Sequence, residues 1–330
     1  MNHFKAVMLT QAGRTTEAKL VDIDESQLPK GDVDVRVEYS SLNFKDALAI
    51  TGRGAIIKRW PMVPGIDLAG VVEHSAHADW RTGDRVVVNG WGLGETHWGG
   101  LTQRARLDGA WLLALPPSYD SRQAMAIGTA GYTAALCVMA LLGHGLTPSD
   151  GPVLVTGASG GVGSVAIVLL AGLGFEVAAS TGRTDAQADY LKDLGAAEIV
   201  DRSSMSTPGK PLQTERWAGV VDTVGSHTLA NACAATKWYG AVAACGLAQG
   251  ADLPATVMPF ILRGVTLYGI NCVYTPNVKR MQAWALLAEH LPATTLARMT
   301  REIGLSECIA GSSDLLDGRL RGRTVVAVDQ

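Results

Sequence analysis

The sequence predicts an α/β protein with a β-rich domain and a second domain built on a doubly wound parallel sheet. Its 330 residues exceed the usual size of a single hydrophobic core. Up to Pro116, short β-type runs alternate with turns rich in Gly, Pro and Asp. Beyond Pro117, strand-like and helix-like segments alternate, which is typical of a parallel sheet.

The first part of the chain contains six runs with the composition of β-strands. Their apolar and β-branched residues are bounded by turn-forming residues. The expected strands are Lys5–Leu9, Ala18–Asp22, Val33–Tyr39, Leu68–Glu73, Arg85–Asn89 and Leu101–Arg106.

The second part begins with a long apolar helix, expected over Ala124–Leu142. Six strands follow, and they are expected over Val153–Thr156, Glu176–Thr181, Glu198–Val200, Gly219–Thr223, Ala241–Cys245 and Thr266–Ile270. Helical spacing in Asp185–Leu194 and Thr228–Thr236 predicts crossover helices, and therefore a parallel, doubly wound sheet.

The end of the chain is expected to return to the first domain. It contains a helical pattern over Val278–Leu291 and a strand pattern over Thr324–Val328. We therefore predict a discontinuous first domain of residues 1–122 and 272–330, and a second domain of residues 123–271.

A glycine-rich turn follows the first strand of the second domain. Glycines at positions 157, 160, 161 and 163 separate this strand from an apolar helix. Backbone N–H groups that carry no side chains can approach phosphate oxygens, and the positive end of the helix dipole lies behind them. We expect Ser159, Gly160, Gly161 and Val162 to bind the diphosphate of a dinucleotide. A tight strand-to-helix connection without a ligand is the alternative.

The end of the next strand indicates which dinucleotide is bound. An NAD site places an acidic residue there to hold the ribose, whereas this chain has Ser180, Thr181, Gly182 and Arg183. Hydroxyl groups and a guanidinium suit a 2′-phosphate, which a carboxylate would repel. The sequence therefore predicts NADPH as the cofactor. Arg202, after the third strand, is expected either to bind the same phosphate or to be a solvated loop residue.

Two further strands of the predicted sheet end in residues that the cofactor could contact. Ligands of doubly wound sheets bind at the carboxyl ends of the strands. We expect contacts from Cys245, Gly246 and Leu247 after the fifth strand, and from Asn271 and Cys272 after the sixth. No cationic neighbour of Cys245 is visible in the sequence, so a nucleophilic thiolate there is poorly supported.

Composition excludes several classes of function. A net charge of −3 and an isoelectric point near 6.2 provide no basic surface for nucleic acid or anionic membranes. The five cysteines form neither a disulfide framework nor a Cys-x-x-Cys metal motif. Neither a signal peptide nor a long uninterrupted apolar run is visible, so a cytoplasmic protein is expected.

Several phrases of the sequence resemble one family. These phrases are Ser40–Leu48, Pro64–Asp67, Gly90–Gly100, Ile127–Ala134 and Ala243–Leu247. Together with the order of the two domains, they resemble the medium-chain dehydrogenase/reductase superfamily, and within it the zinc-free acryloyl-CoA reductase (quinone oxidoreductase) branch. The resemblance spans the whole chain. It implies a GroES-like catalytic domain, an inserted Rossmann domain, a cleft between them and a homodimer.

The resemblance also implies the reaction. The protein is expected to reduce the C=C bond of acryloyl-CoA, or of a similar short α,β-unsaturated acyl thioester, by hydride transfer from NADPH to the β carbon. Negative charge on the thioester oxygen then requires hydrogen-bond donors. Reduction of quinones or free enones is one alternative, and a non-enzymatic NADPH-binding sensor or structural protein is another. Lys45, Lys58, Arg59 and Arg323 are cations that coenzyme A could use, or solvated surface charges.

We expect the site to contain no metal. Zinc-dependent relatives place a Cys near the start of the segment Ser41–Asp46 and a His-Glu pair at Ile66 and Asp67, and this chain has neither. The four cysteines of their structural zinc site are also absent between Arg85 and Leu113. Hydrogen-bond donors must therefore polarise the substrate.

Asn43 and Asp46 are the leading candidates for catalytic residues. Asn43 can donate to an oxyanion or a ribose, and Asp46 can hold a hydroxyl or a cation. Their i, i+3 spacing places them on one helical face. The same spacing fits a helix cap with a carboxylate in the first turn, which requires no substrate.

Three further residues are expected near the nicotinamide. Relatives have Tyr at the position of Phe44, so either the Phe44 ring alone packs against the cofactor or another donor, such as Tyr132, replaces the missing hydroxyl. Thr129 lies in a Gly-Thr-Ala-Gly turn that opens a helix. It is expected either to contact the cofactor or to cap that helix.

Overall fold

The computed structural model describes residues 3–13 and 15–330. Within them the chain folds as two compact units. The first unit contains the residues up to Thr129, then Cys272–Met281 and Leu296–Gln330, and the second contains Ala130–Asn271 and Gln282–Thr295. The chain thus enters the second unit after residue 129 rather than 122, and residues 282–295 group with the second unit rather than the first.

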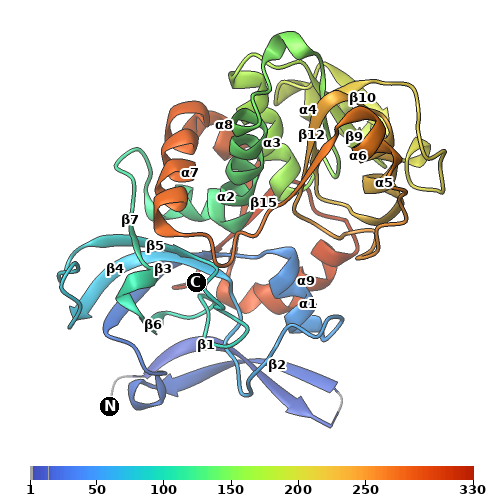
Figure 1. The fold of residues 1–330 in the computed structure, drawn as a ribbon. Helices are drawn as coiled ribbons and strands as arrows, with labels where there is room; N and C mark the ends of the chain where they lie inside the picture. The colour runs from blue at the N-terminus through green and yellow to red at the C-terminus, as the bar shows by residue number, and fades with distance from the viewer. Residues whose placement is uncertain (1–2, 14) are drawn as a thin grey trace. The chain divides into compact units, whose positions relative to one another are not determined.

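A seven-stranded sheet forms the first unit, in the order β14-β15-β3-β4-β5-β7 with β6 beside β3. Its strands are β3 (Val33–Ser41), β4 (Asp67–Ser75), β5 (Arg85–Asn89), β6 (Arg104–Leu107), β7 (Leu113–Ala114), β14 (Thr300–Gly304) and β15 (Arg323–Ala327). β1 (His3–Ala12) and β2 (Thr15–Asp24) pair separately as an antiparallel hairpin, the dark blue arrows of Figure 1. Because β15 pairs with β3, the C-terminal end of the chain belongs to this unit, as expected.

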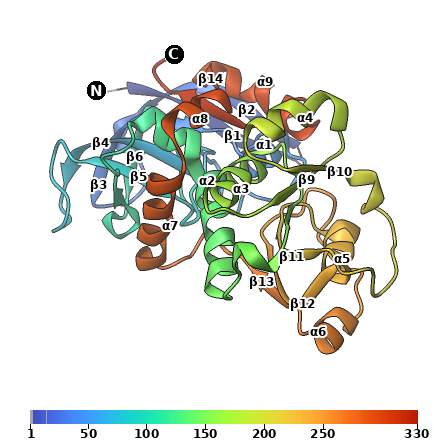
Figure 2. The same cartoon turned by 90° about the horizontal axis from the view of Figure 1, so that it is seen from above.

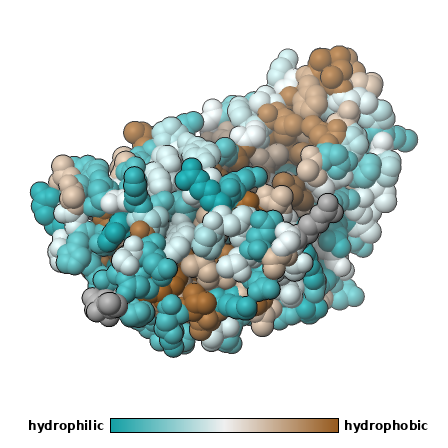
Figure 3. Space-filling model, turned by 90° about the horizontal axis from the view of Figure 1, so that it is seen from below, coloured by the Kyte–Doolittle hydropathy of each residue, from teal (hydrophilic) through white to brown (hydrophobic). Residues whose placement is uncertain are grey.

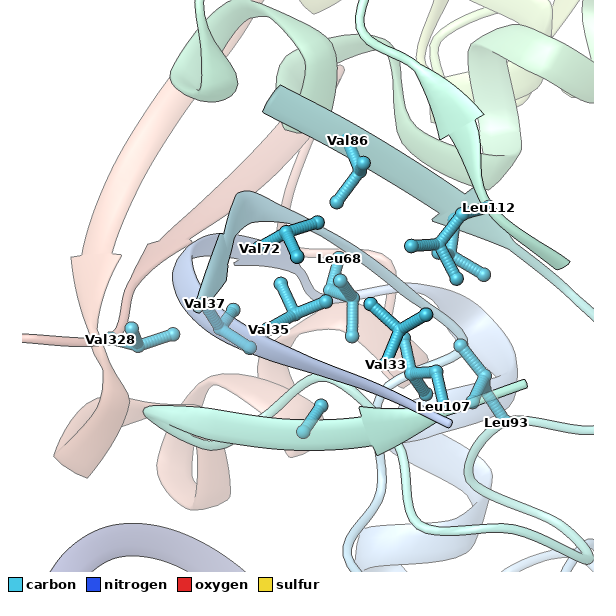
Figure 4. Packing of buried hydrophobic residues seen from close by; sticks show 12 residues of the cluster. Val33, Val35, Val37, Leu68, Val72, Val86, Leu93, Leu107, Leu112 and Val328 are labelled. Atoms are coloured by element: carbon cyan, nitrogen blue, oxygen red, sulfur yellow. The ribbon is translucent and has the colours of Figure 1, made fainter. Parts of the chain in front are cut away.

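Valines at alternate positions of β3 build the core of this sheet. Val33, Val35 and Val37 are fully buried, because side chains two residues apart point to the same face of a strand. Figure 4 shows them packed against Leu68, Val72, Val86, Leu93, Leu107, Leu112 and Val328. The alternation that predicted the strand therefore also supplies the hydrophobic face.

The second unit contains a six-stranded parallel sheet in the order β10-β9-β8-β11-β12-β13. Its strands are β8 (Val153–Val155), β9 (Val177–Thr181), β10 (Glu198–Asp201), β11 (Trp217–Asp222), β12 (Thr236–Ala244) and β13 (Thr266–Gly269). The chain reverses its direction of winding between β8 and β11, so the carboxyl ends of these strands flank the position at which such sheets bind ligands. The row from β10 to β13 can be followed in Figure 2. The predicted doubly wound sheet is confirmed.

The helices are α1 (Phe44–Thr51), α2 (Ser121–Gly143), α3 (Gly161–Gly172), α4 (Thr184–Asp193), α5 (Ser226–Ala234), α6 (Met258–Arg263), α7 (Asn277–His290), α8 (Ala293–Arg298) and α9 (Cys308–Leu316). Short 3₁₀ helices cover Glu25–Gln27, Gly109–Trp111, Pro148–Asp150, Arg202–Ser204 and Leu305–Glu307. The predicted helices correspond to α2, α4, α5 and α7. The sequence analysis missed β14 and α9, whose segment carries no clear periodicity.

α2 is one continuous apolar stretch of the sequence, but its helical backbone is interrupted at Gly128. The backbone of Gly128 has φ 51° and ψ −161°, a conformation that favours glycine. A Cβ placed there would collide with the Arg323 guanidinium and would lie 2.7 Å from Ser41 Oγ. By length and composition alone α2 could cross a membrane, but 78% of its apolar window is buried within the protein, as in a core helix.

We predict that Gly128→Ala strongly destabilises the protein. The variant combines a disfavoured backbone conformation with a steric clash, and each costs on the order of 1–3 kcal/mol. Gly143→Ala is the matched control, because no atom lies within 4 Å of a Cβ at that helical glycine. There alanine should leave stability unchanged or raise it by up to about 1 kcal/mol. Denaturant unfolding of both variants measures the difference, and equal stabilities would contradict the prediction.

Candidate functional site

The predicted diphosphate turn connects β8 to α3 in the second unit. Gly157 has φ 58°, and α3 begins at Gly161 with Gly160 as its N-cap residue. A Cβ on Gly163 would lie 2.5 Å from the carbonyl oxygen of Gly157, so a side chain there would force the turn apart. The first N–H groups of a helix have no partner within the helix. This end of α3 therefore has the geometry of an anion site. Binding of a diphosphate by Ser159, Gly160, Gly161 and Val162 stays a prediction.

A buried clamp holds the turn against the neighbouring strand. The Thr156 hydroxyl donates to Asp222 Oδ1 at 2.7 Å and accepts from the backbone N–H of Thr223 at 3.1 Å. The Thr223 hydroxyl donates back to the carbonyl of Thr156 at 3.0 Å. Burial raises the pKa of Asp222, while the Thr156 hydrogen bond lowers it. The clamp joins the carboxyl ends of β8 and β11, which flank the ligand-binding position of the sheet.

The two predicted phosphate-binding arginines come from different segments that meet at Gly182. Arg202 follows β10, and its guanidinium packs flat over Gly182, where a Cβ would lie 2.7 Å from its Cζ. Arg183 is the N-cap residue of α4, and its backbone N–H donates to Thr181 Oγ1 at 3.3 Å. Within residues 3–13 and 15–330, neither guanidinium forms an ion pair with a carboxylate. Two cations beside buried Ser180 and Thr181 form a site suited to a phosphate.

The other predicted cofactor contacts lie at the ends of β12 and β13. The Cys245 thiol donates to the carbonyl of Asp222 at 3.4 Å, which fits a structural cysteine. Gly246 packs against the backbone of Thr223, and Leu247 is 57% exposed. Asn271 is the last residue of this segment in the second unit, and Cys272 is the first that belongs to the first unit.

In the first unit, Asp46 caps α1. Its Oδ2 accepts from the backbone N–H of Asn43 at 2.9 Å, and its Oδ1 accepts from Gly65 and Ile66 at 3.1 and 2.9 Å. Only 1% of Asp46 is exposed. Burial and the neighbouring Asp67 raise its pKa to about 7, against the effect of these donors. The helix-cap interpretation accounts for the contact with Asn43, whereas the contacts with Gly65 and Ile66 connect this cap to the segment before β4.

Asn43 has its side-chain amide fully engaged. Its nitrogen lies 3.1 Å from each of three oxygens, Asp46 Oδ2, Asp67 Oδ2 and Ser41 Oγ. Its oxygen accepts from Arg323 Nη1 at 3.0 Å. The structure therefore brings Asn43 and Asp46 together, but inside a buried network that also contains Ser41, Asp67 and Arg323. The sequence analysis did not place these three residues with them.

The remaining candidates are distributed over both units. Thr129 donates its backbone N–H to Asp67 Oδ2 at 2.7 Å, which satisfies the start of the second half of α2. Phe44 is 41% exposed, whereas Tyr132, in the second unit, is fully buried. The burial of Tyr132 provides no support for a donor to substrate.

Two cations considered for coenzyme A are engaged elsewhere. Arg323 is 3% exposed and donates to protein oxygens, so its interpretation as a surface cation is wrong. Burial is the reason, because such a group cannot reach a phosphate at the surface. Lys45 forms an ion pair with Glu95.

Comparisons with known proteins match both units. The family model of the alcohol dehydrogenase GroES-like domain matches residues 29–135, and that of zinc-binding dehydrogenases matches residues 161–289. Among the described residues, no group of three or more His, Cys, Asp or Glu side chains could hold a metal ion. The metal-free site stays a prediction.

Three relatives are similar over nearly the whole chain. The acrylyl-CoA reductase AcuI of Ruegeria pomeroyi is 51% identical over 95% of this chain and 95% of its own length. The yhdH oxidoreductase of Salmonella enterica, solved with NADP, has a TM-score of 0.96 and 50% identity, covering 98% of this chain and 99% of its own. The yhfP protein of Bacillus subtilis, solved with NAD, has a TM-score of 0.95 and 39% identity, covering 99% and 100%. The chain therefore belongs to the medium-chain dehydrogenase/reductase superfamily, in its acrylyl-CoA reductase branch.

Proposed function

We propose that this protein reduces the C=C bond of acryloyl-CoA, or of a similar short α,β-unsaturated acyl thioester, with NADPH as the reductant. The observation that carries the proposal is the glycine turn of the second unit together with Arg183 and Arg202, which have no ion-pair partner among the described residues. The similarity to AcuI supports the substrate class, and the NADP in the yhdH structure supports the cofactor.

The second unit is proposed to bind NADPH in three places. The N-terminus of α3, with Ser159 to Val162, binds the diphosphate. The turn from Ser180 to Arg183, with Arg202, binds the 2′-phosphate. The ends of β12 and β13, with Cys245 to Leu247 and Asn271 to Cys272, line the rest of the dinucleotide. Bound NADPH supplies the hydride.

The first unit is proposed to serve the acyl group. Negative charge that develops on the thioester oxygen must be met by hydrogen-bond donors fixed in place before the reaction. Asn43 is proposed to orient the donors of this site, and Phe44 and Thr129 are proposed to contact the nicotinamide. Asp46 contributes by fixing the start of α1, since its oxygens already receive donors from the protein. The site is proposed to work without metal.

The cofactor assignment is tested by Arg183→Ala and Arg202→Ala. Loss of a hydrogen bond between charged groups costs about 1.5–3 kcal/mol, so each variant should raise the Kd for NADPH by roughly 10- to 100-fold. The Kd for NADH, which lacks the 2′-phosphate, should change little. Arg216→Ala, at an exposed arginine of the same unit that pairs with Glu198, should leave both values unchanged. Fluorescence titration measures all four constants, and an equal loss for NADPH and NADH would refute the assignment.

The reaction is tested by comparing acryloyl-CoA, a quinone and a free enone as substrates for NADPH oxidation. We expect the highest kcat/KM with acryloyl-CoA. Deuterated NADPH in water should place deuterium on the β carbon of the product, and unlabelled NADPH in heavy water should place it on the α carbon. Preference for the quinone would make the protein a quinone reductase, and turnover of none of the three would favour a non-enzymatic NADPH-binding protein.

A homodimer formed through the second unit is proposed as the assembly, located in the cytoplasm and without nucleic-acid or membrane partners. Among the strands that the structure describes, β13 has a neighbour on one side alone. Exposed apolar residues surround this edge, namely Trp238, Tyr239, Val257, Ile261 and Leu262. Figure 3 shows hydrophobic surface gathered over the end of the unit that carries α6. An apolar sheet edge is a natural pairing surface for a second copy of the chain.

Light scattering tests this assembly. The wild-type chain should have the mass of a dimer, and Ile261→Asp, at a side chain that is 71% exposed, should have the mass of a monomer. Val278→Asp, at an exposed valine of the first unit, should remain a dimer. A monomeric wild type would overturn the proposal, as would a dimer that survives Ile261→Asp.

A further inference from the structure

The Arg323 guanidinium, at the first residue of β15, is buried at the centre of the network around Asn43. It is 3% exposed. We propose that Arg323 is a positioning residue for the reduction: it fixes the orientation of the Asn43 amide and the backbone that presents Thr129. This inference rests on the proposed function and adds a residue to it.

Arg323 donates through each of its three nitrogens. Nε donates to the carbonyl of Ala126 at 2.8 Å, and Nη2 donates to the carbonyl of Met125 at 3.2 Å and to Ser41 Oγ at 2.8 Å. Nη1 donates to Asn43 Oδ1 at 3.0 Å. A planar guanidinium can meet this set of acceptors because its donors have a fixed fork geometry, which a lysine ammonium lacks.

The contact with Nη1 determines which way the Asn43 amide faces. With its oxygen on Arg323, the amide nitrogen faces the carboxylates of Asp46 and Asp67. A flipped amide would turn its nitrogen toward the guanidinium and its oxygen toward two carboxylates. Either contact would repel, so the flip is disfavoured in a buried site.

Arg323 and Asp67 also satisfy the two sides of the break in α2. The first half of the helix ends in carbonyls, and Arg323 binds those of Met125 and Ala126. The second half begins at Thr129, whose backbone N–H donates a hydrogen bond to Asp67 Oδ2. Helix ends inside a protein need such partners. Gly128 lies between them with no room for a side chain.

The two charged groups are connected through Ser41. Its hydroxyl donates to Asp67 Oδ1 at 2.7 Å and accepts from Arg323 Nη2 and Asn43 Nδ2. One donor and two acceptors are the full capacity of a hydroxyl. Removal of the guanidinium therefore leaves Ser41, Asn43 and two helix carbonyls short of a partner at once.

The test begins with Arg323→Lys, which keeps the positive charge but loses the planar, forked arrangement of hydrogen-bond donors. We expect kcat for acryloyl-CoA to fall about 100-fold, the scale for a displaced catalytic group. KM for NADPH should change far less, because the residues proposed to bind its phosphate groups lie in the second unit. Leu107→Ala is the control for destabilisation, since Leu107 is buried in the core of the same unit and outside the network. It should retain wild-type kcat per folded molecule.

Chemical rescue of Arg323→Ala provides the second readout. Millimolar guanidine should raise its kcat, whereas urea at the same concentration, which has similar shape but no charge, should raise it less. A kcat of Arg323→Lys close to wild type would overturn the proposal, as would rescue by urea equal to that by guanidine. If Arg323→Ala does not fold, the Arg323→Lys measurement decides. If the wild-type protein does not reduce acryloyl-CoA, the proposed function fails, and the same variants are then measured with the substrate that is turned over.

Discussion

Burial of Arg323 with the carboxylates of Asp46 and Asp67 constrains the whole first unit. Removing these charges from water costs several kcal/mol for each ion, and only well-placed partners offset that cost. The partners come from five segments that are distant in the sequence, namely β3, α1, β4, α2 and β15. Because each segment supplies a donor or an acceptor that the others need, none can move without leaving a buried polar group unpaired.

In the second unit, unlike the first, the charged groups of the candidate site are not paired with carboxylates of the described residues. Its candidate site consists of backbone N–H groups at the start of α3 and of two arginines without ion-pair partners in the described part of the chain. Backbone N–H groups at a helix N-terminus and guanidinium groups are the donors that bind phosphate anions in proteins. The rigid part of this site is the clamp between Thr156, Asp222 and Thr223, which fixes the glycine turn to the next strand. The hydrogen bonds among Thr156, Asp222 and Thr223 thus fix the strand from which the glycine turn and its N–H donors begin.

The sequence predicted much of the second unit because its signals are local. The glycine turn follows β8, the Ser180 to Arg183 segment spans the end of β9, and short runs rich in apolar residues marked β8, β9 and β11. The family and the fold class are confirmed by the relatives and by the two matching family models. β14 and α9 were missed because their segment shows no regular spacing of apolar residues, and their pairing with β15 and packing on α1 depend on contacts far along the chain.

The sequence by itself predicted the parallel sheet, the glycine turn, NADPH as the cofactor and the family. These predictions rest on residue types that are close together in the sequence. Such local motifs can be interpreted without knowing which distant segments come into contact. The tertiary structure determined the surroundings of the polar candidates, which lie in both units. It assigned Asp46 to a helix cap, engaged the Asn43 amide, buried Tyr132 and moved Arg323 from an expected surface position to the centre of the network. Asn43 and Arg323 are 280 residues apart in the chain, and no local pattern encodes which distant charges will share one buried site or how much water they lose.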